Sequence, residues 1–207
     1  MHYFPITPRL QRLYASNATA RHMRWHAEHM QEDGKMCHPS DSPSWKHLDS
    51  TFPEFANQVQ NIRIGLCSDG FQPFGQSGGQ YSSWPVILIP TSENVYERGV
   101  HVFLSILVPG PNNPKAKGDV FLQPLIDELN HLWAYGVQTY DTYKKQNFQM
   151  RAVLMWMIND FPAYSMLSGW RTMGRKHVHI VEKIQMHSLY LSVESNHGLT
   201  ITVSFYP

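Results

Sequence analysis

Cysteine, charge and long apolar runs are all scarce in this sequence. Two cysteines among 207 residues, Cys37 and Cys67, exclude a disulfide scaffold and are typical of a reducing compartment. Charged residues make up 16% of the chain and the formal net charge is +1, so composition does not indicate a nucleic-acid surface or an anionic membrane partner. No apolar run approaches the roughly 20 residues that span a bilayer, and the first residues lack a signal-peptide pattern. We therefore expect a soluble intracellular protein with no membrane partner.

Apolar residues are plentiful, and histidine is the compositional oddity. Hydrophobic residues make up 42% of the chain and aromatic residues 13%, which favours one globular domain, alone or with extensions. Among the 12 histidines, His26, His29 and His38 lie with Cys37 at spacings loosely like those of a zinc site. An adjacent cysteine–histidine pair is awkward for one tetrahedral ion, so we favour structural or surface histidines over metal ligands.

Three short apolar segments predict three β-strands. Residues 61–67 (NIRIGLC) alternate apolar and other side chains and end in a Ser-Asp-Gly turn. Residues 84–89 (WPVILI) and 102–108 (VFLSILV) are short apolar runs that end at prolines. Strands this close in sequence predict an antiparallel meander.

A helix and a fourth strand are expected next. Residues 119–135 carry leucines, isoleucine and tryptophan at three- and four-residue steps, which predicts an amphipathic helix capped by Gly136. Residues 152–158 (AVLMWMI) are continuously apolar, as in a strand covered on both faces. Upstream, we expect a short helix over 44–48 within an irregular extension of loops and short helices over residues 1–60.

This order of elements predicts an α/β protein that begins as RNase H-like folds begin. Three antiparallel strands are followed by a crossover helix and a fourth strand beside the first. Asp69 ends the first strand and Asp160 ends the fourth, so the two carboxylates are expected to converge. Convergent carboxylates are what two Mg²⁺ ions need for phosphoryl transfer. The alternative is that both acids belong to ordinary turns, where aspartate is common.

The chain resembles the transposases of plant CACTA (En/Spm-type) DNA transposons. The resemblance covers most of residues 25–175, and the matching stretches include WHAEHMQEDGKMCHPSDSPSWKHLD, NIRIGLCSDGFQPFG, YSSWPVILIP, FLSILVPGPNNPKAKGDVFLQPLIDELNHLWAYGVQTYD and NFQMRAVLMWMINDFPAYSMLSGWRTMGR. It implies a DDE/D-type transposase with an RNase H-like core. Asp69, in LCSDGF, corresponds to the first catalytic acid, and Asp160, in NDFPA, looks like the second.

The resemblance also implies a cofactor, partners and a compartment. Mg²⁺ or Mn²⁺ would be held by Asp69 and Asp160 in the intact parent. The partners would be transposon DNA ends, target DNA and further transposase subunits, with no small-molecule substrate, and the protein would act in the nucleus.

The last 32 residues, 176–207, depart from the family pattern. The family's Cys-x-x-Cys pair and its later Ser-Trp-Phe-Asp stretch are missing. Codons for residues 177–181 and 196–200 can be chosen so that one common offset restores CPYC and SWFD, which leads to the hypothesis of a frameshift near Arg175. We thus divide the chain into an extension (1–60), a partial transposase core (61–175) and an out-of-frame tail (176–207).

Because the catalytic core is expected to be incomplete, three functional interpretations stay open. The third catalytic acid is missing, and neither Glu182 nor Glu194 replaces it, so we expect an RNase H-like fold that is incomplete and a fragment that is inactive alone. The alternatives are a non-catalytic DNA- or transposase-binding protein, such as a repressor or domesticated remnant, and a pseudogene product. Lys144, Lys145 and the N-terminal arginines are expected to form solvated faces, given the near-zero net charge.

Overall fold

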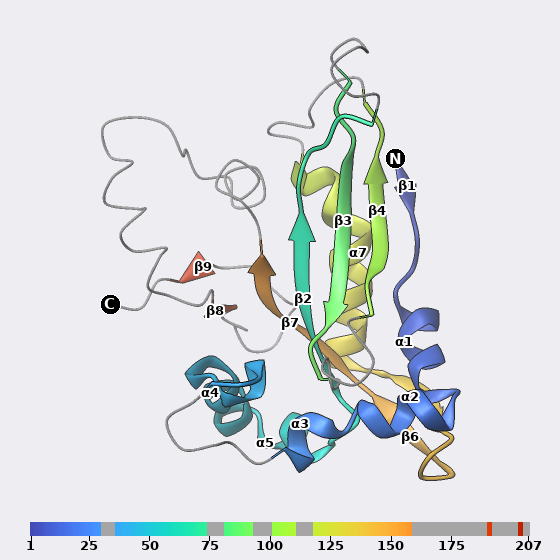
Figure 1. Cartoon of the computed structure of the whole chain (residues 1–207), viewed down its shortest axis with the longest axis vertical. Coiled ribbons are helices and arrows are strands. Elements are labelled where there is room, and N and C mark those ends of the chain that lie inside the picture. The colour runs from blue at the N-terminus through green and yellow to red at the C-terminus, as the bar shows by residue number, and fades with distance from the viewer. Residues whose placement is uncertain are drawn as a thin grey trace.

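A mixed five-stranded β-sheet forms the centre of the molecule (Figure 1). The computed structural model describes residues 1–29, 36–73, 81–92, 101–110, 118–158, 190–191 and 203–204. The order of strands across the sheet is β1-β4-β3-β2-β7. These strands are β1 (His2–Tyr3), β2 (Ile62–Ser68), β3 (Trp84–Pro90), β4 (Phe103–Val108) and β7 (Ala152–Ile158).

The predicted order of strands, helix and strand is confirmed. Strand β2 pairs antiparallel with β3, and β3 pairs antiparallel with β4. Helix α7 (Gly118–Ala134) then leads, through a hairpin, to β7, which pairs parallel with β2. Gly136 follows α7 at φ +67°, and a Cβ there would lie 2.7 Å from the carbonyl oxygen of Met150, so glycine is required at this helix end.

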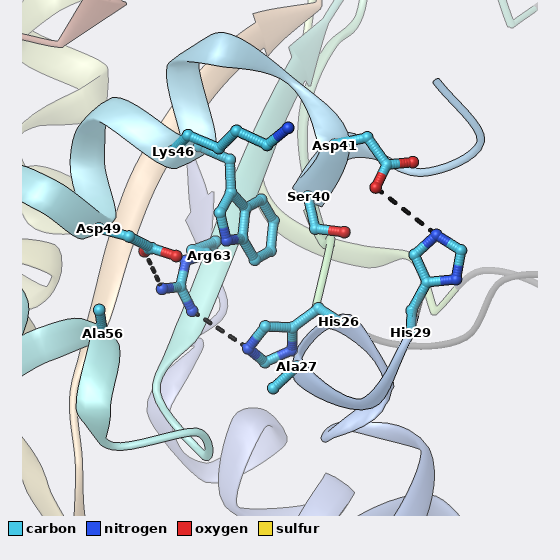
Figure 2. A pocket seen from close by; sticks show the side chains of 10 residues that line it. His26, Ala27, His29, Ser40, Asp41, Lys46, Asp49, Ala56 and Arg63 are labelled. Carbon is cyan, nitrogen blue, oxygen red and sulfur yellow. Dashed lines mark hydrogen bonds and ion pairs between the residues drawn. The ribbon is translucent and has the colours of Figure 1, made fainter. Parts of the chain in front are cut away.

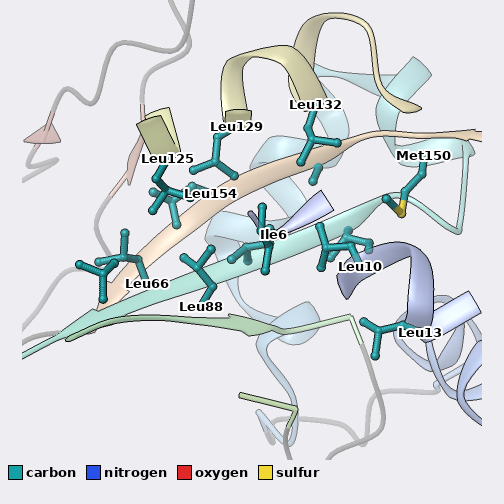
Figure 3. Packing of buried hydrophobic residues seen from close by; sticks show 14 of the residues in the cluster. Ile6, Leu10, Leu13, Leu66, Leu88, Leu125, Leu129, Leu132, Met150 and Leu154 are labelled. Carbon is teal, nitrogen blue, oxygen red and sulfur yellow. The ribbon is translucent and has the colours of Figure 1, made fainter. Parts of the chain in front are cut away.

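Helix α7 covers one face of the sheet and encloses the larger core. Apolar side chains of β2, β3 and β7 point toward α7, as Figure 3 shows for Leu66, Leu88 and Leu154. The apolar side chains predicted along one side of the helix face the sheet. Burial of each leucine contributes roughly 1.5–3 kcal/mol to the stability of the fold. The helical members are Leu122, Leu125, Leu129 and Leu132.

The opposite face of β2 and β7 is covered by helices from the upstream part of the chain. Trp45 and Phe55 from these helices pack with Val153 and Met155 of β7 in a second cluster. Strand β7 is therefore covered on both faces, as its continuous apolar sequence predicts. The covering helices are α4 (Pro43–Thr51) and α5 (Pro53–Asn57). The other upstream helices are α2 (Asn17–His22), whose Ala20 belongs to the larger core, α3 (Trp25–Glu28) and the 3₁₀ helix η1 (Pro39–Asp41). Helix α4 contains the short helix expected over 44–48.

Two features that the sequence did not predict lie at the N-terminus and before β7. Helix α1 (Thr7–Tyr14) places Leu10, Leu13 and Tyr14 in the larger core, although arginines and a proline obscure its periodicity. The hairpin β5 (Val137–Asp141) and β6 (Gln146–Met150) connects α7 to β7. The division at residue 60 stays a prediction, but residues on both sides of it share one core.

Glu128 of α7 ties the helix to the N-terminal segment. Its carboxylate accepts hydrogen bonds from the Tyr3 hydroxyl and from the backbone N–H groups of Ile6 (2.9 Å) and Thr7 (2.8 Å). It therefore sits at the positive end of the α1 dipole. Burial acts to raise the pKa of Glu128, but these hydrogen bonds outweigh it and hold the pKa below its ordinary value.

Two short strands of the tail, β8 (Tyr190–Leu191) and β9 (Val203–Ser204), pair antiparallel with each other. Neither Cys37 nor Cys67 is joined in a disulfide bond. Within the described ranges, no helix has the length and hydropathy that crossing a membrane requires.

Candidate functional site

Asp69 follows directly after β2, at the carboxyl end of the sheet. Its side chain is exposed, and its Oδ1 atom accepts a hydrogen bond from the N–H of Gly70 at 2.6 Å. Among the described residues, no other hydrogen bond to this carboxylate is found. An exposed carboxylate of this kind is the oxygen ligand that a hard cation prefers.

The backbone around Asp69 is fixed on both sides. Before it, the Ser68 hydroxyl donates to the carbonyl oxygen of Pro85 at 2.9 Å. After it, Phe71 and Ser83 form an antiparallel bridge with two N–H···O bonds of 3.0 and 2.9 Å. An exposed acid on a fixed turn is preorganised for binding, whereas most exposed turns move more freely.

The packing around position 70 explains why glycine follows Asp69. A Cβ at this position would lie 2.4 Å from the ring of Trp84, which is 8% exposed and belongs to the larger core. The Trp84 ring thus packs directly on the Gly70 backbone and holds the turn against β3. Any side chain at Gly70 would displace the ring or the turn that carries Asp69.

The strand carrying Asp69 lies beside the strand that precedes Asp160. In the parallel pairing of β2 and β7, Cys67 is opposite Ile158. Asp69 follows Cys67 by two residues, and Asp160 follows Ile158 by two residues. Asp160 itself lies outside the described residues. The predicted neighbourhood of the two strands is confirmed, and the convergence of the two carboxylates stays a prediction.

The histidine-rich segment forms a cluster against β2 (Figure 2). The His26 ring lies with Nδ1 3.1 Å from the carbonyl oxygen of Ser92 and Nε2 3.3 Å from Nη1 of Arg63. A guanidinium only donates, so Nε2 accepts and Nδ1–H donates, which fixes a neutral tautomer. Burial first, and then the Arg63 charge, lower the pKa of His26 to about 3.

Arg63 is the centre of this cluster and is 1% exposed. Its guanidinium forms an ion pair with Asp49 and lies over the rings of Trp45 and Phe55, 4.4 and 5.1 Å from their centroids. The ion pair and aromatic rings compensate for burying the charge. A pocket of about 250 Å³ opens beside it, lined in part by His26, His29, Asp41, Lys46, Asp49 and Arg63.

The remaining members of the proposed zinc spacing also have structural partners. His29 stacks on Trp25 at 4.2 Å, and its Nε2 lies 3.5 Å from the Asp41 carboxylate. His38 Nδ1 accepts from the Ser40 N–H at 3.1 Å and caps η1. Among the described residues, no three histidine, cysteine or acidic side chains are grouped as a metal would need.

Sequence reasoning missed the Arg63 cluster because the alternation in residues 61–67 predicts a strand but does not show what covers each of its faces. In β2 the alternate residues do point to the face opposite α7, but α4 and α5 cover that face. The available signal was the cluster of Trp45, Phe52 and Phe55 immediately upstream, since short aromatic-rich helices need an apolar surface to cover.

Comparison with known proteins gives one match. Residues 33–198, well over half of the chain, match the family model described as Transposase family tnp2. Neither the curated proteins nor the solved structures that were compared include a match. The matched range contains Asp69 and Asp160, and it continues past Arg175 into the tail. The chain therefore belongs to the transposase family tnp2.

Proposed function

We propose that this transposase-derived chain is a CACTA-type catalytic core in which Asp69 and Asp160 hold Mg²⁺ or Mn²⁺ for DNA cleavage and strand transfer. The observation that carries the proposal is the pairing of β2 with β7. It brings the carboxyl ends of two parallel strands together, and an aspartate lies two residues beyond each of the paired residues Cys67 and Ile158. Membership of the family suggests DNA as a partner in general.

The arrangement of strands supports an RNase H-like assignment for the core. An antiparallel β2-β3-β4 meander, the crossover helix α7 and a parallel β7 beside β2 follow the order expected of that fold. The β5–β6 hairpin is an insertion between the crossover helix and the fourth strand. The assignment rests on this order of elements.

In this proposal, Asp69 and Asp160 would act by holding the metal ions with their carboxylates. Asp69 presents its exposed carboxylate from a turn fixed by the Phe71–Ser83 bridge and by the Trp84 ring. Asp160 would supply the second carboxylate. Divalent ions held between such acids lower the pKa of a bound water or hydroxyl and stabilise the leaving oxygen of a phosphodiester. Transposon ends and target DNA are the proposed substrates, in the nucleus.

The absence of a third catalytic acid limits the activity that we expect of this chain. No residue of this sequence is assigned that role, so we expect weak or absent cleavage by this chain alone. An out-of-frame origin of residues 176–207 would explain the loss, whereas an in-frame origin accounts more directly for a family match that reaches residue 198. The genomic sequence after the Arg175 codon decides between them, because codons incompatible with the offset reading would exclude the frameshift.

A strand-nicking assay tests the catalytic proposal. The full chain, Asp69→Ala and Asp160→Ala are incubated with supercoiled and linear DNA in Mg²⁺ or Mn²⁺. Metal-dependent nicking that both substitutions abolish supports the proposal, and nicking that survives either substitution overturns that residue's role. If all three proteins are inactive, as the missing third acid predicts, the metal affinity of wild type and the Asp69 variant decides instead. Equal metal affinity together with salt-dependent DNA binding favours the non-catalytic DNA-binding alternative.

A further inference from the structure

Two acid-free stretches of the sequence lie side by side in the fold. Residues 1–27 contain no aspartate or glutamate, and neither do residues 142–159. The side chain of Gln11 on α1 donates to the carbonyl oxygen of Gln138 on β5 at 3.0 Å. The N–H of Thr142 donates to the carbonyl oxygen of Tyr14 at 3.1 Å. These contacts place α1 against the β5–β6 hairpin, so their cations share one region of the molecule (Figure 1).

The exposed side chains of this region are cationic, aromatic or amide-bearing. Lys144 and Lys145 are exposed at the hairpin turn, and Arg12 and Arg21 are exposed on α1 and α2. Tyr140 is 52% exposed and Tyr143 is 40% exposed on the same hairpin. The acid of the hairpin, Asp141, is fully buried and so adds no exposed carboxylate beside the lysines. The whole-chain charge of +1 conceals this local excess of positive charge.

The hairpin turn holds its lysines in a fixed backbone. Asp141 Oδ1 accepts from the N–H groups of Tyr143 (2.9 Å) and Lys144 (3.0 Å), and Oδ2 accepts from the Gln60 side chain at 3.1 Å. Lys145 has φ +56°, a left-handed conformation that favours glycine or asparagine in turns. Both lysines are therefore held on a turn whose backbone is fixed by a buried carboxylate.

We propose that α1, α2 and the β5–β6 hairpin form a surface for the phosphate backbone of duplex DNA, with Lys144 and Lys145 as its main contacts. This inference rests on the proposed function, because the surface would bind the same DNA that the proposed metal site cleaves. It would do so at a distance from Asp69 and Asp160. The hairpin precedes β7 and Asp69 follows β2, so the two are at opposite ends of the sheet. Strand β7 spans about 20 Å, and the five residues of β6 lie between it and the hairpin turn, so a duplex longer than one turn of B-DNA, about 34 Å, is needed to contact both places.

The test uses charge-removing substitutions that suit the turn. Lys144→Gln with Lys145→Asn removes two charges, and asparagine tolerates the left-handed conformation. Lys46→Gln is the matched control, since Lys46 is exposed on α4, away from this surface. Binding to a fluorescent 30-base-pair duplex is measured by anisotropy from low to moderate salt, and circular dichroism checks folding of each full-length variant.

We expect the double variant to bind about tenfold more weakly at low salt, with a log–log salt slope reduced by about 2, since each phosphate contact contributes about 0.9. The Lys46 control should bind as wild type does. A double variant with wild-type affinity and slope overturns the inference and leaves the metal-site proposal standing. Absence of salt-dependent DNA binding by wild type overturns both this surface and the DNA partner.

Discussion

Two aspartates that lie beyond opposite ends of strands β2 and β7 have opposite environments. At the amino end, Asp141 of the β5–β6 hairpin is 0% exposed and accepts hydrogen bonds from Gln60, Tyr143 and Lys144. At the carboxyl end, Asp69 is exposed and bonds to the adjacent Gly70 N–H. A carboxylate with several donors stabilises the fold, whereas an exposed carboxylate on a fixed turn remains available to a ligand. The buried aspartate therefore has a structural role, and the exposed one is the residue for which we propose metal binding.

Breaking the buried ion pair near the amino end should have the largest effect. Arg63→Ala removes the charge that pairs with Asp49 and packs on Trp45, and we expect a loss of about 3 kcal/mol in the free energy of unfolding. Asp49 is 35% exposed on its side chain and can rehydrate, which limits the loss. Urea unfolding measures this loss, with Lys144→Ala, an exposed side chain outside the cluster, as a control expected to change little. A loss below that of an ordinary surface substitution would show that Arg63 does not organise the cluster.

Removing Asp141 compares the two ends directly. Asp141→Ala leaves two turn N–H groups and the Gln60 amide without their acceptor, so we expect a loss of roughly 2 kcal/mol. Asp69→Ala at the other end should change stability by less than about 0.5 kcal/mol, because its carboxylate is exposed and bonds locally. Both are measured by urea unfolding under the same conditions. Equal losses would remove the distinction between the two ends.

The buried imidazole of His26 predicts a smaller, pH-dependent effect at the amino end. Its folded pKa of about 3 lies below the ordinary 6.5, so protonation favours the unfolded chain. The stability it supports is present above about pH 6.5 and falls as the pH drops toward 3. Between pH 7 and pH 5 we expect this group to account for about 1–2 kcal/mol of lost stability. Urea unfolding of wild type and His26→Gln across that range should show a shallower pH slope for the variant, and equal slopes would contradict the lowered pKa of His26.

Much of the sheet could be predicted from local sequence, because each of its long strands has its own signal. The alternation in 61–67, the apolar run in 152–158 and the stripe in 119–135 each match an element to within a residue or two. The position of Asp69 followed from the end of its strand. The order of strands then followed because a helix crossover places the fourth strand parallel to another.

The rest depends on contacts between distant segments. Helix α1 and strand β1 are stabilised by Glu128, more than a hundred residues away, and no local pattern reveals that. The burial of Arg63 depends on helices from residues 43–57 packing over its strand. The hairpin turn has Lys145 where glycine is usual, so its turn signal was absent.

Metal binding at the carboxyl end is the most direct test of the central claim. Mn²⁺ titration of the full chain, followed by electron paramagnetic resonance, compares wild type with Asp69→Asn, using Asp127→Asn on the exposed side of α7 as the matched control. We expect wild type and the control to bind Mn²⁺ alike and Asp69→Asn to lose at least about tenfold in affinity with unchanged stability. Equal Mn²⁺ affinity in all three proteins would contradict a metal-holding role for Asp69.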